Sequence, residues 1–327
     1  QLGTGLQELR TLSLMVRLAF LWRRGIPTNW LQRHLNSGVI KLDTIDIKKP
    51  GKIVLIPCTG TTQHGRVYRF CNECMKIKNS LPTISVVIAT HNSSRTIGRC
   101  LKSIRDQNYP HEKIEIIIAD GGSTDYTHDI ASPYNVRWIP IEKVKQNAEY
   151  NKAMGIGRAR NEIVAMIDHD NVLPHRKWLQ NMVTPFMEQK QVVGVETLRY
   201  HYDPKTSLLD RYFALFGAGD PIVWYLGKAD RLSYIYDDYV LSGDATDNGR
   251  YYLVRFRPEN MPTIGANGFL VRRQVLIDNA KISPGAYFDM DVNIDLIKKG
   301  FNTYAFVKDS ILHLTGYGNI LNFLKRR

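Results

Sequence analysis

Residues 84–122 read ISVVIATHNSSRTIGRCLKSIRDQNYPHEKIEIIIADGG. Two short apolar runs, 84–89 and 114–119, flank a segment with helical spacing from about Ser94 to Gln107. Short runs rich in β-branched residues are typical of strands that are buried on both faces of a parallel sheet. This stretch therefore predicts a β-α-β unit.

The same alternation continues along the chain. The sequence predicts a helix over 124–130, a strand over 136–140, a helix over 148–159 and a strand over 163–167. Strands that alternate with helices form a mainly parallel sheet with helices on both faces. The chain is therefore predicted to be an α/β protein, and 327 residues are enough for one large domain or two smaller ones.

Polar clusters follow three of the predicted strands at the point where each strand ends. These clusters are THN at 90–92, DGGS at 120–123 and DHD at 168–170. In open α/β sheets, ligands bind beyond the carboxyl ends of the strands. The three clusters are therefore expected to meet at one edge of the sheet and to form a ligand site.

Two carboxylates stand close together in Asp168-His169-Asp170. Their repulsion must be offset by a divalent cation, by a cationic partner or by solvation. A divalent ion held there would also bind a diphosphate. His169, between the two aspartates, is expected to face away from the ligand.

Asp120 is followed by two glycines, which let the backbone approach a flat ligand closely. A carboxylate at this place can accept a hydrogen bond from a base N–H or from a ribose hydroxyl. Ser123 or Asp125 is expected to cap the next helix, which would leave Asp120 free for the ligand.

Three segments together resemble the inverting family-two glycosyltransferases, which have the GT-A fold. They are PTISVVIATHNSSRTIGRCLKSI at 82–104, IIIADGGSTD at 116–125 and MIDHDNVLP at 166–174. The resemblance covers about residues 82–315, and it divides the chain into a GT-A domain at 82–327 and an N-terminal extension at 1–81. The resemblance does not extend to residues 1–81.

The resemblance implies roles for the residues at the strand ends. Thr90, Asn92, Asp120 and Asp168 are expected to bind the nucleotide sugar. The metal, Mn²⁺ or Mg²⁺, is expected to be held by Asp170, and His313 resembles the histidine that completes the metal site in many GT-A enzymes. Tyr150 departs from the family, which commonly has a basic residue there, so a side-chain contact with the diphosphate is in doubt.

On the acceptor side, the resemblance implies a glycine-containing loop at 265–269 and a helix that begins with the catalytic base. Asp289 stands at the place of the base, and Asp291 is a possible substitute. Phe288 departs from the family, which usually has Glu before the base. The segment from Tyr200 to Pro258, rich in Tyr, Trp and Asp, lies where the family varies its acceptor-binding part.

The reaction implied is one in-line displacement, with inversion, of a nucleoside diphosphate by an acceptor hydroxyl or phosphate. The acceptor would be a glycan or a lipid-linked molecule. Two alternatives remain: a nucleotidyltransferase acting on sugar phosphates, and a non-catalytic sugar- or lipid-binding module. The first would favour a Gly-rich loop with Lys or Arg after strand 84–89, whereas the sequence there is THNSSR. The second is disfavoured because all four aspartates, at 120, 168, 170 and 289, are present.

The net charge of +13 is concentrated in the N-terminal extension, which carries +9. A basic extension suits an anionic partner such as a membrane, a nucleic acid or a phosphorylated lipid. Residues 6–24 mix apolar and basic residues at helical spacing, so they either lie on a membrane or pack on the main domain. For a sugar-transferring enzyme we expect a peripheral membrane contact and no nucleic acid partner. The expected location is the cytoplasm, at the inner face of the membrane. No segment of about 18 residues is apolar enough to span a bilayer.

Four potential zinc ligands lie within the extension: Cys58, His64, Cys71 and Cys74. A single CxxC pair is a weak signal for zinc, and reduced thiols or a local disulfide are the alternatives. Cys100, in the first predicted helix, is expected to be a small buried residue.

Overall fold

The structure is a computed structural model that describes residues 81–219 and 221–316. Apart from Leu81, the predicted extension lies outside the described residues. The predictions for the segment 6–24 and for the CxxC region therefore stay untested. Cys100 is a free, buried cysteine, as expected.

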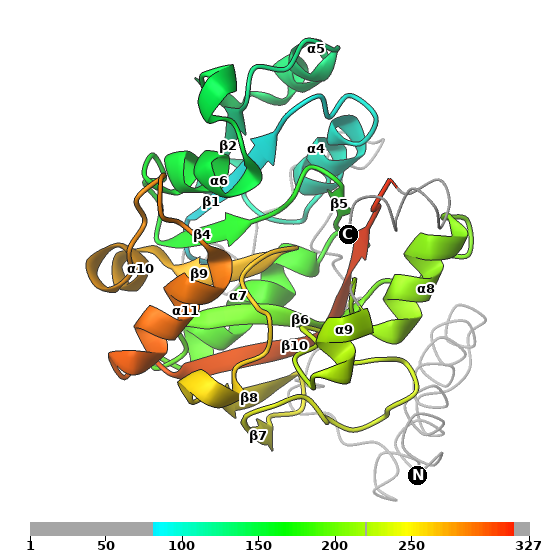
Figure 1. Cartoon of the computed structure of the whole chain (residues 1–327), viewed down its shortest axis with the longest axis vertical. Coiled ribbons are helices and arrows are strands. Elements are labelled where there is room, and N and C mark those ends of the chain that lie inside the picture. The colour runs from blue at the N-terminus through cyan, green and yellow to red at the C-terminus, as the bar shows by residue number, and fades with distance from the viewer. Residues whose placement is uncertain (1–80, 220, 317–327) are drawn as a thin grey trace, which may run out of the picture. The chain divides into compact units, whose positions relative to one another are not determined.

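A single ten-stranded sheet forms the centre of the described domain (Figure 1). Its strands are β1 (Ile84–Thr90), β2 (Ile114–Asp120), β3 (Arg137–Pro140), β4 (Ile163–Met166), β5 (Asn171–Val172), β6 (Gly194–Tyr200), β7 (Asp244–Asp247), β8 (Tyr251–Arg255), β9 (Phe269–Arg272) and β10 (Thr303–His313). The order across the sheet is β3-β2-β1-β4-β9-β6-β10-β8-β7, and β5 pairs with the end of β10.

Eight α-helices accompany these strands in the described part of the chain. They are α4 (Ile97–Arg105), α5 (Thr127–Ala131), α6 (Ala148–Ile156), α7 (Trp178–Glu188), α8 (Leu208–Phe216), α9 (Pro221–Tyr225), α10 (Arg273–Asn279) and α11 (Asp289–Lys298). The predicted α/β fold is confirmed, and so are the predicted strands and helices between 84 and 167, with ends that differ by a few residues.

The first four strands of the sheet order, β3, β2, β1 and β4, pair in parallel. All seven residues of β1 are buried. Val86 and Ile88 pack into one core with α4 and α7, whereas Val87 packs into a second core with α6 and α11. Successive side chains of a strand point to opposite faces, so this mostly apolar and fully buried strand is covered on both faces of the sheet.

The other half of the sheet is mixed. Strand β9 runs antiparallel to both β4 and β6, and β8 runs antiparallel to β10. β9 begins directly after the loop 265–268 and lies beside β4, so this loop is held next to the end of β4, where Asp168 follows. The topology therefore joins the predicted donor side and acceptor side of the site.

Candidate active site

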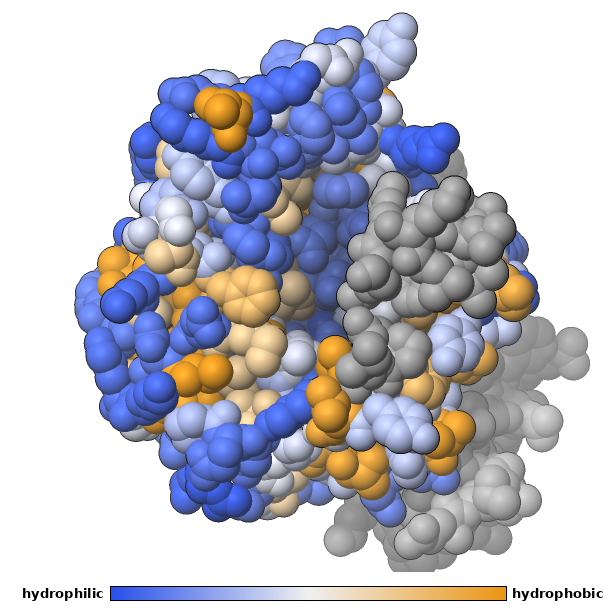
Figure 2. All heavy atoms as spheres, in the orientation of Figure 1, coloured by the Kyte–Doolittle hydropathy of each residue, from blue (hydrophilic) through white to orange (hydrophobic). Residues whose placement is uncertain are grey.

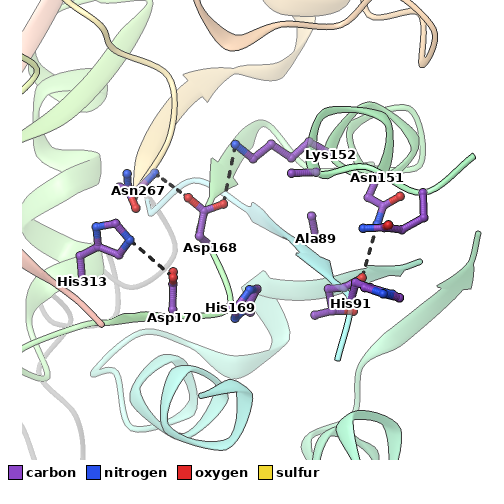
Figure 3. Close-up of a pocket in the computed structure, with 12 residues that line it drawn as sticks. Ala89, His91, Asn151, Lys152, Asp168, His169, Asp170, Asn267 and His313 are labelled. Atoms are coloured by element: carbon purple, nitrogen blue, oxygen red, sulfur yellow. Dashed lines mark hydrogen bonds and ion pairs between the residues drawn. The ribbon is translucent and has the colours of Figure 1, made fainter. Parts of the chain in front are cut away.

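A cavity of about 410 Å³ opens at the carboxyl ends of β1 and β4. Most of its lining residues are polar, and Figure 2 shows a hollow in this face of the molecule with hydrophilic residues in its depth. The cavity is lined by Ala89, Thr90, His91, Gln146, Ala148, Asn151, Lys152, Asp168, His169, Asp170, Asn267 and His313. Four residues predicted for the site, Thr90, Asp168, Asp170 and His313, are thus brought together. Figure 3 shows the last three of them.

Asp168 and Asp170 lie in a tight turn that is built around Asn171. The Asn171 side chain accepts a hydrogen bond from the Asp168 N–H at 2.9 Å, and the Asn171 N–H donates to the Asp168 carbonyl at 2.9 Å. Strand β4 ends at Met166, so the alternation of side chains stops before the turn. His169 is among the residues that line the cavity, and its ring contacts Thr96, with Nδ1 at 2.9 Å from Thr96 Oγ1, so the expectation that it faces away from the ligand stays a prediction.

Strand β10 carries His313 to this turn from the far end of the chain. Its last residues pair with β5, so that His313 lies opposite Asn171. His313 Nε2 is 3.5 Å from Asp170 Oδ2 (Figure 3). Burial raises the pKa of Asp170, but His313 and His169 lower it more, and the net pKa is below the ordinary value. Conversely, burial lowers the pKa of His313 and Asp170 raises it, with a net increase.

These residues fit a divalent cation. Asp170 Oδ1 is buried and has no hydrogen-bond partner among the described residues. A buried, unpaired carboxylate oxygen costs free energy, and a cation ligated there removes that cost. Within residues 81–219 and 221–316, no three His, Cys, Asp or Glu side chains form a complete metal-binding group. Asp170 and His313 would therefore supply two ligands, and diphosphate oxygens and water would supply the rest, which is usual for Mg²⁺.

Asp120 is not free, in contrast to the prediction that a helix cap at Ser123 would spare it. Its carboxylate accepts hydrogen bonds from Thr90 Oγ1 at 2.8 Å, from Ser123 Oγ at 2.5 Å, and from the N–H groups of Gly122 and Ser123 at 3.1 and 2.8 Å. A carboxylate offers about four lone-pair positions, so the loop itself fills them. Asp125, the other proposed cap, accepts from the N–H groups of Ser94 and Thr127.

Asn92 lies outside the residues that line the cavity. It has a left-handed φ of 50°, and its side-chain oxygen accepts from the Thr124 N–H at 2.9 Å. Asn92 therefore ties the loop after β1 to the loop after β2. Together with Asp120, it shapes the wall beside Thr90, and its direct contact with a donor remains a prediction.

The first residue of α11 is Asp289, the predicted base. Its side chain is mostly buried, and Oδ1 accepts from the Tyr287 hydroxyl at 2.7 Å. The amino end of a helix carries a partial positive charge that stabilises a carboxylate. Asp291, the possible substitute, is exposed to solvent on the same turn. The geometry therefore favours Asp289 over Asp291 as the group that faces the site.

The loop 265–268 brings α11 close to the cavity because it has two glycines with positive φ. A Cβ on Gly265 (φ 127°) would lie 2.9 Å from Asp289 Cβ, and a Cβ on Gly268 (φ 91°) would lie 2.5 Å from Ile311 Cδ1. Between them, the Asn267 N–H donates to Asp168 Oδ2 at 3.3 Å. Only residues without a side chain permit this close approach.

Asn267 makes hydrogen bonds to several residues of the site, and the sequence analysis did not identify it as a site residue. Its side-chain oxygen accepts from Asn171 at 3.0 Å, and its carbonyl accepts from Arg231 Nη2 at 3.0 Å. Arg231 is fully buried and pairs with the buried Glu196 at 2.5 Å. Removal of one partner of a buried ion pair is strongly destabilising. The pair of Arg231 with Glu196 therefore fixes the guanidinium that binds the Asn267 carbonyl in the loop 265–268.

Lys152 is the other residue that sequence reasoning missed. It lies on α6 next to Asn151, and its ammonium is 2.9 Å from Asp289 Oδ2 and 3.7 Å from Asp168 Oδ1. Burial lowers the pKa of Lys152, but the surrounding carboxylates raise it further, so the side chain stays charged. Tyr150, at the place where the resemblance expects a basic residue, is not among the residues lining the cavity. Lys152, two positions later, does line the cavity.

The fold and this cavity define the class: a GT-A glycosyltransferase, an α/β enzyme with its acidic residues beyond the carboxyl ends of the strands. Residues 85–277 match the model of glycosyl transferase family 2, and this match covers more than half of the chain. The chain therefore belongs to that family. The nucleotidyltransferase and the non-catalytic module are set aside.

Individual relatives match over shorter stretches. The glycosyltransferase AglE of Haloferax volcanii is 33% identical over 110 residues, which are 32% of this chain and 36% of that protein. The GalNAc(5)-diNAcBac-PP-undecaprenol beta-1,3-glucosyltransferase of Campylobacter jejuni is 28% identical over 98 residues, 28% of this chain and 31% of that protein. The match with each of these curated relatives spans about a third of the relative's length.

A solved structure with a similar chain path is the mannosyltransferase PcManGT of Pyrobaculum calidifontis in complex with GDP-Man and Mn²⁺. It has 18% sequence identity and a TM-score of 0.44, and the match covers 71% of this chain and 56% of that chain. None of the helices in the described ranges has the length and apolar character needed to cross a membrane.

Proposed function

We propose that the protein transfers a sugar from a nucleoside-diphosphate sugar to a glycan or a lipid-linked acceptor, with inversion and with a divalent cation. One observation carries the proposal. The cavity places Asp168, Asp170 and His313 on one side, and Lys152 connects that side to Asp289, which begins a helix on the other side.

The residues divide the work between donor and acceptor. Thr90 and the loop held by Asp120 form the wall for the nucleotide, together with Asp168. Asp170 and His313 would hold Mn²⁺ or Mg²⁺, which when bound would stabilise the negative charge of the departing diphosphate. Asp289 accepts the proton of the attacking hydroxyl, a contribution of roughly 10²–10⁴-fold in rate. One displacement at the anomeric carbon inverts its configuration.

The charge balance of the cavity supports a metal-dependent donor. Two aspartates and one lysine stand among its lining residues. A diphosphate is repelled by the carboxylates unless a divalent cation lies between them. Metal and diphosphate are therefore expected to bind together.

The experiment is an assay of nucleotide release. The full chain is incubated with a panel of UDP- and GDP-sugars in MnCl₂, and UDP or GDP is quantified. We expect release from one class of donor and its loss in EDTA. Release that is equal in EDTA, or release from none of the donors, contradicts the proposal.

We further propose a peripheral contact with the inner, cytoplasmic face of a membrane. The charge of +9 in residues 1–81 supports this, because each Lys or Arg near an anionic surface contributes roughly 1 kcal/mol. The name of the Campylobacter jejuni relative includes an undecaprenol-linked glycan, which supports a lipid-linked acceptor here.

Liposome co-sedimentation tests this contact. We expect binding to anionic vesicles that weakens with added salt and with deletion of residues 1–24, because charge and apolar area act together at such surfaces. The control is neutral vesicles of the same size. Equal and negligible binding to both kinds of vesicle would rule the contact out.

A further inference from the structure

Lys152 occupies an unusual place between the two halves of the site. Its side chain is only 8% exposed, and it extends from α6 along the cavity toward Asp168 (Figure 3). The ammonium contacts a carboxylate on each side, Asp289 at 2.9 Å and Asp168 at 3.7 Å. A lysine buried so fully costs free energy unless it is paired, and here it is paired twice.

Lys152 is also the one lysine or arginine among the described residues that line the cavity. Within residues 81–219 and 221–316, no other permanently positive side chain lines the cavity for a donor diphosphate to contact. The four-carbon side chain of lysine is flexible, and its three N–H donors can exchange acceptors by rotation.

In the structure, Lys152 donates a hydrogen bond to Asp289, the proposed base. Asp289 Oδ2 accepts from Lys152, and Oδ1 accepts from Tyr287 at 2.7 Å. Burial beside Asp289 raises the pKa of the Tyr287 phenol well above its ordinary value, so this hydroxyl remains a donor. Each oxygen of Asp289 thus already accepts one hydrogen bond, and the departure of Lys152 would free one more of the four lone-pair positions of the carboxylate for the acceptor hydroxyl.

We propose that Lys152 changes partners when the donor binds: its ammonium leaves Asp289 for the diphosphate, and the base becomes free only when a donor is in place. This inference rests on the proposed function and adds a coupling between donor binding and base activation. Lys152 is a diphosphate-binding and positioning residue in this scheme. Asp289 and the diphosphate compete for one cation, so the removal of either must strengthen the hold of Lys152 on the other.

The competition is measured by calorimetric titration of UDP and GDP, in MnCl₂, into the full chain. Lys152→Met is expected to weaken binding by about tenfold, the scale of one lost charge-assisted hydrogen bond. Asp289→Asn is expected to tighten binding several-fold because it releases Lys152. In the double variant, Asp289→Asn should add nothing to the effect of Lys152→Met.

Asp291→Asn is the matched control, because it removes the same charge from the same helical turn at an exposed position. It should change the affinity by less than about twofold, the scale of a screened surface charge. Lys152→Arg keeps the positive charge and should retain most of the affinity. The Asp289→Asn titration stands by itself if Lys152→Met fails to fold, which the thermal midpoint reports.

The exchange of partners is overturned, with the transferase left intact, by equal affinities for Asp289→Asn and Asp291→Asn, or by unchanged affinity in Lys152→Met. A tightening by Asp289→Asn that persists in the Lys152→Met background also overturns it, since the effect would then be general charge removal. Wild-type protein that binds neither UDP nor GDP in Mn²⁺ instead contradicts the proposed function itself.

Discussion

Asp289→Asn is expected to lower the rate of sugar transfer by at least about 10²-fold, the scale of a lost general base. Asparagine keeps the size of the side chain and its hydrogen bond with Tyr287, but it cannot take a proton. Nucleotide binding should survive, because Asp289 lies beside the cavity and not among the residues that line it. The measurement is initial-rate kinetics of nucleotide release with donor and acceptor at saturation.

Asp291→Asn is the control for this prediction as well. Asp291 is exposed, whereas Asp289 faces Lys152 and Tyr287. Transfer by Asp291→Asn is expected to remain near the wild-type rate. The opposite pattern, with transfer lost in Asp291→Asn and kept in Asp289→Asn, would place the base two residues further along α11.

Asp170→Ala is expected to abolish metal-dependent nucleotide binding and to lower transfer by roughly 10²–10³-fold or more, since a metal contributes several kcal/mol to charge stabilisation. The variant loses the buried oxygen that has no partner among the described residues, and it leaves His313 without its carboxylate. Titration of Mn²⁺ against UDP affinity, together with the transfer rate, measures both effects.

The matched control for Asp170→Ala is Asp129→Ala, which removes an aspartate whose side chain is 76% exposed on α5. It should leave affinity and rate unchanged, and both variants should keep the circular dichroism spectrum of the wild type. If Asp170→Ala retains full activity in EDTA, the assignment of the metal site is wrong.

The parallel half of the sheet could be predicted because each of its strands is recognisable from the residue pattern within the strand itself. Runs such as 84–89 and 114–119 are apolar except for one residue each, Ser85 and Glu115, which indicates burial on both faces, and each run is followed by a polar turn. The antiparallel half was harder to predict. β9 has only four residues and pairs with strands from distant parts of the chain, so its direction depends on tertiary contacts that no periodicity records.

The site divides in the same way. Asp168 and Asp170 could be found because they follow a strand directly. The contact between Lys152 and Asp289 joins residues 137 positions apart, and only the folded chain brings them together. The nearest signal in the sequence was Tyr150, two positions before Lys152, where the resemblance leads one to expect a basic residue.

The error at Asp120 had a local cause that was visible in the sequence. An aspartate followed by two glycines and a serine readily accepts from backbone N–H groups two and three residues ahead. The structure has these bonds, from Gly122 and Ser123. Hydrogen bonds within the turn Asp120-Gly121-Gly122-Ser123 thus occupy the carboxylate that was expected to remain free.

The anomeric configuration of the product tests the central claim most directly. Once nucleotide release has identified a donor, proton NMR of the newly formed product shows which anomer appears first. A single displacement assisted by Asp289 predicts the configuration opposite to that of the donor, a β product from an α-linked sugar nucleotide. A product that retains the configuration of the donor would contradict the account, because it requires two displacements or a different attack on the anomeric carbon.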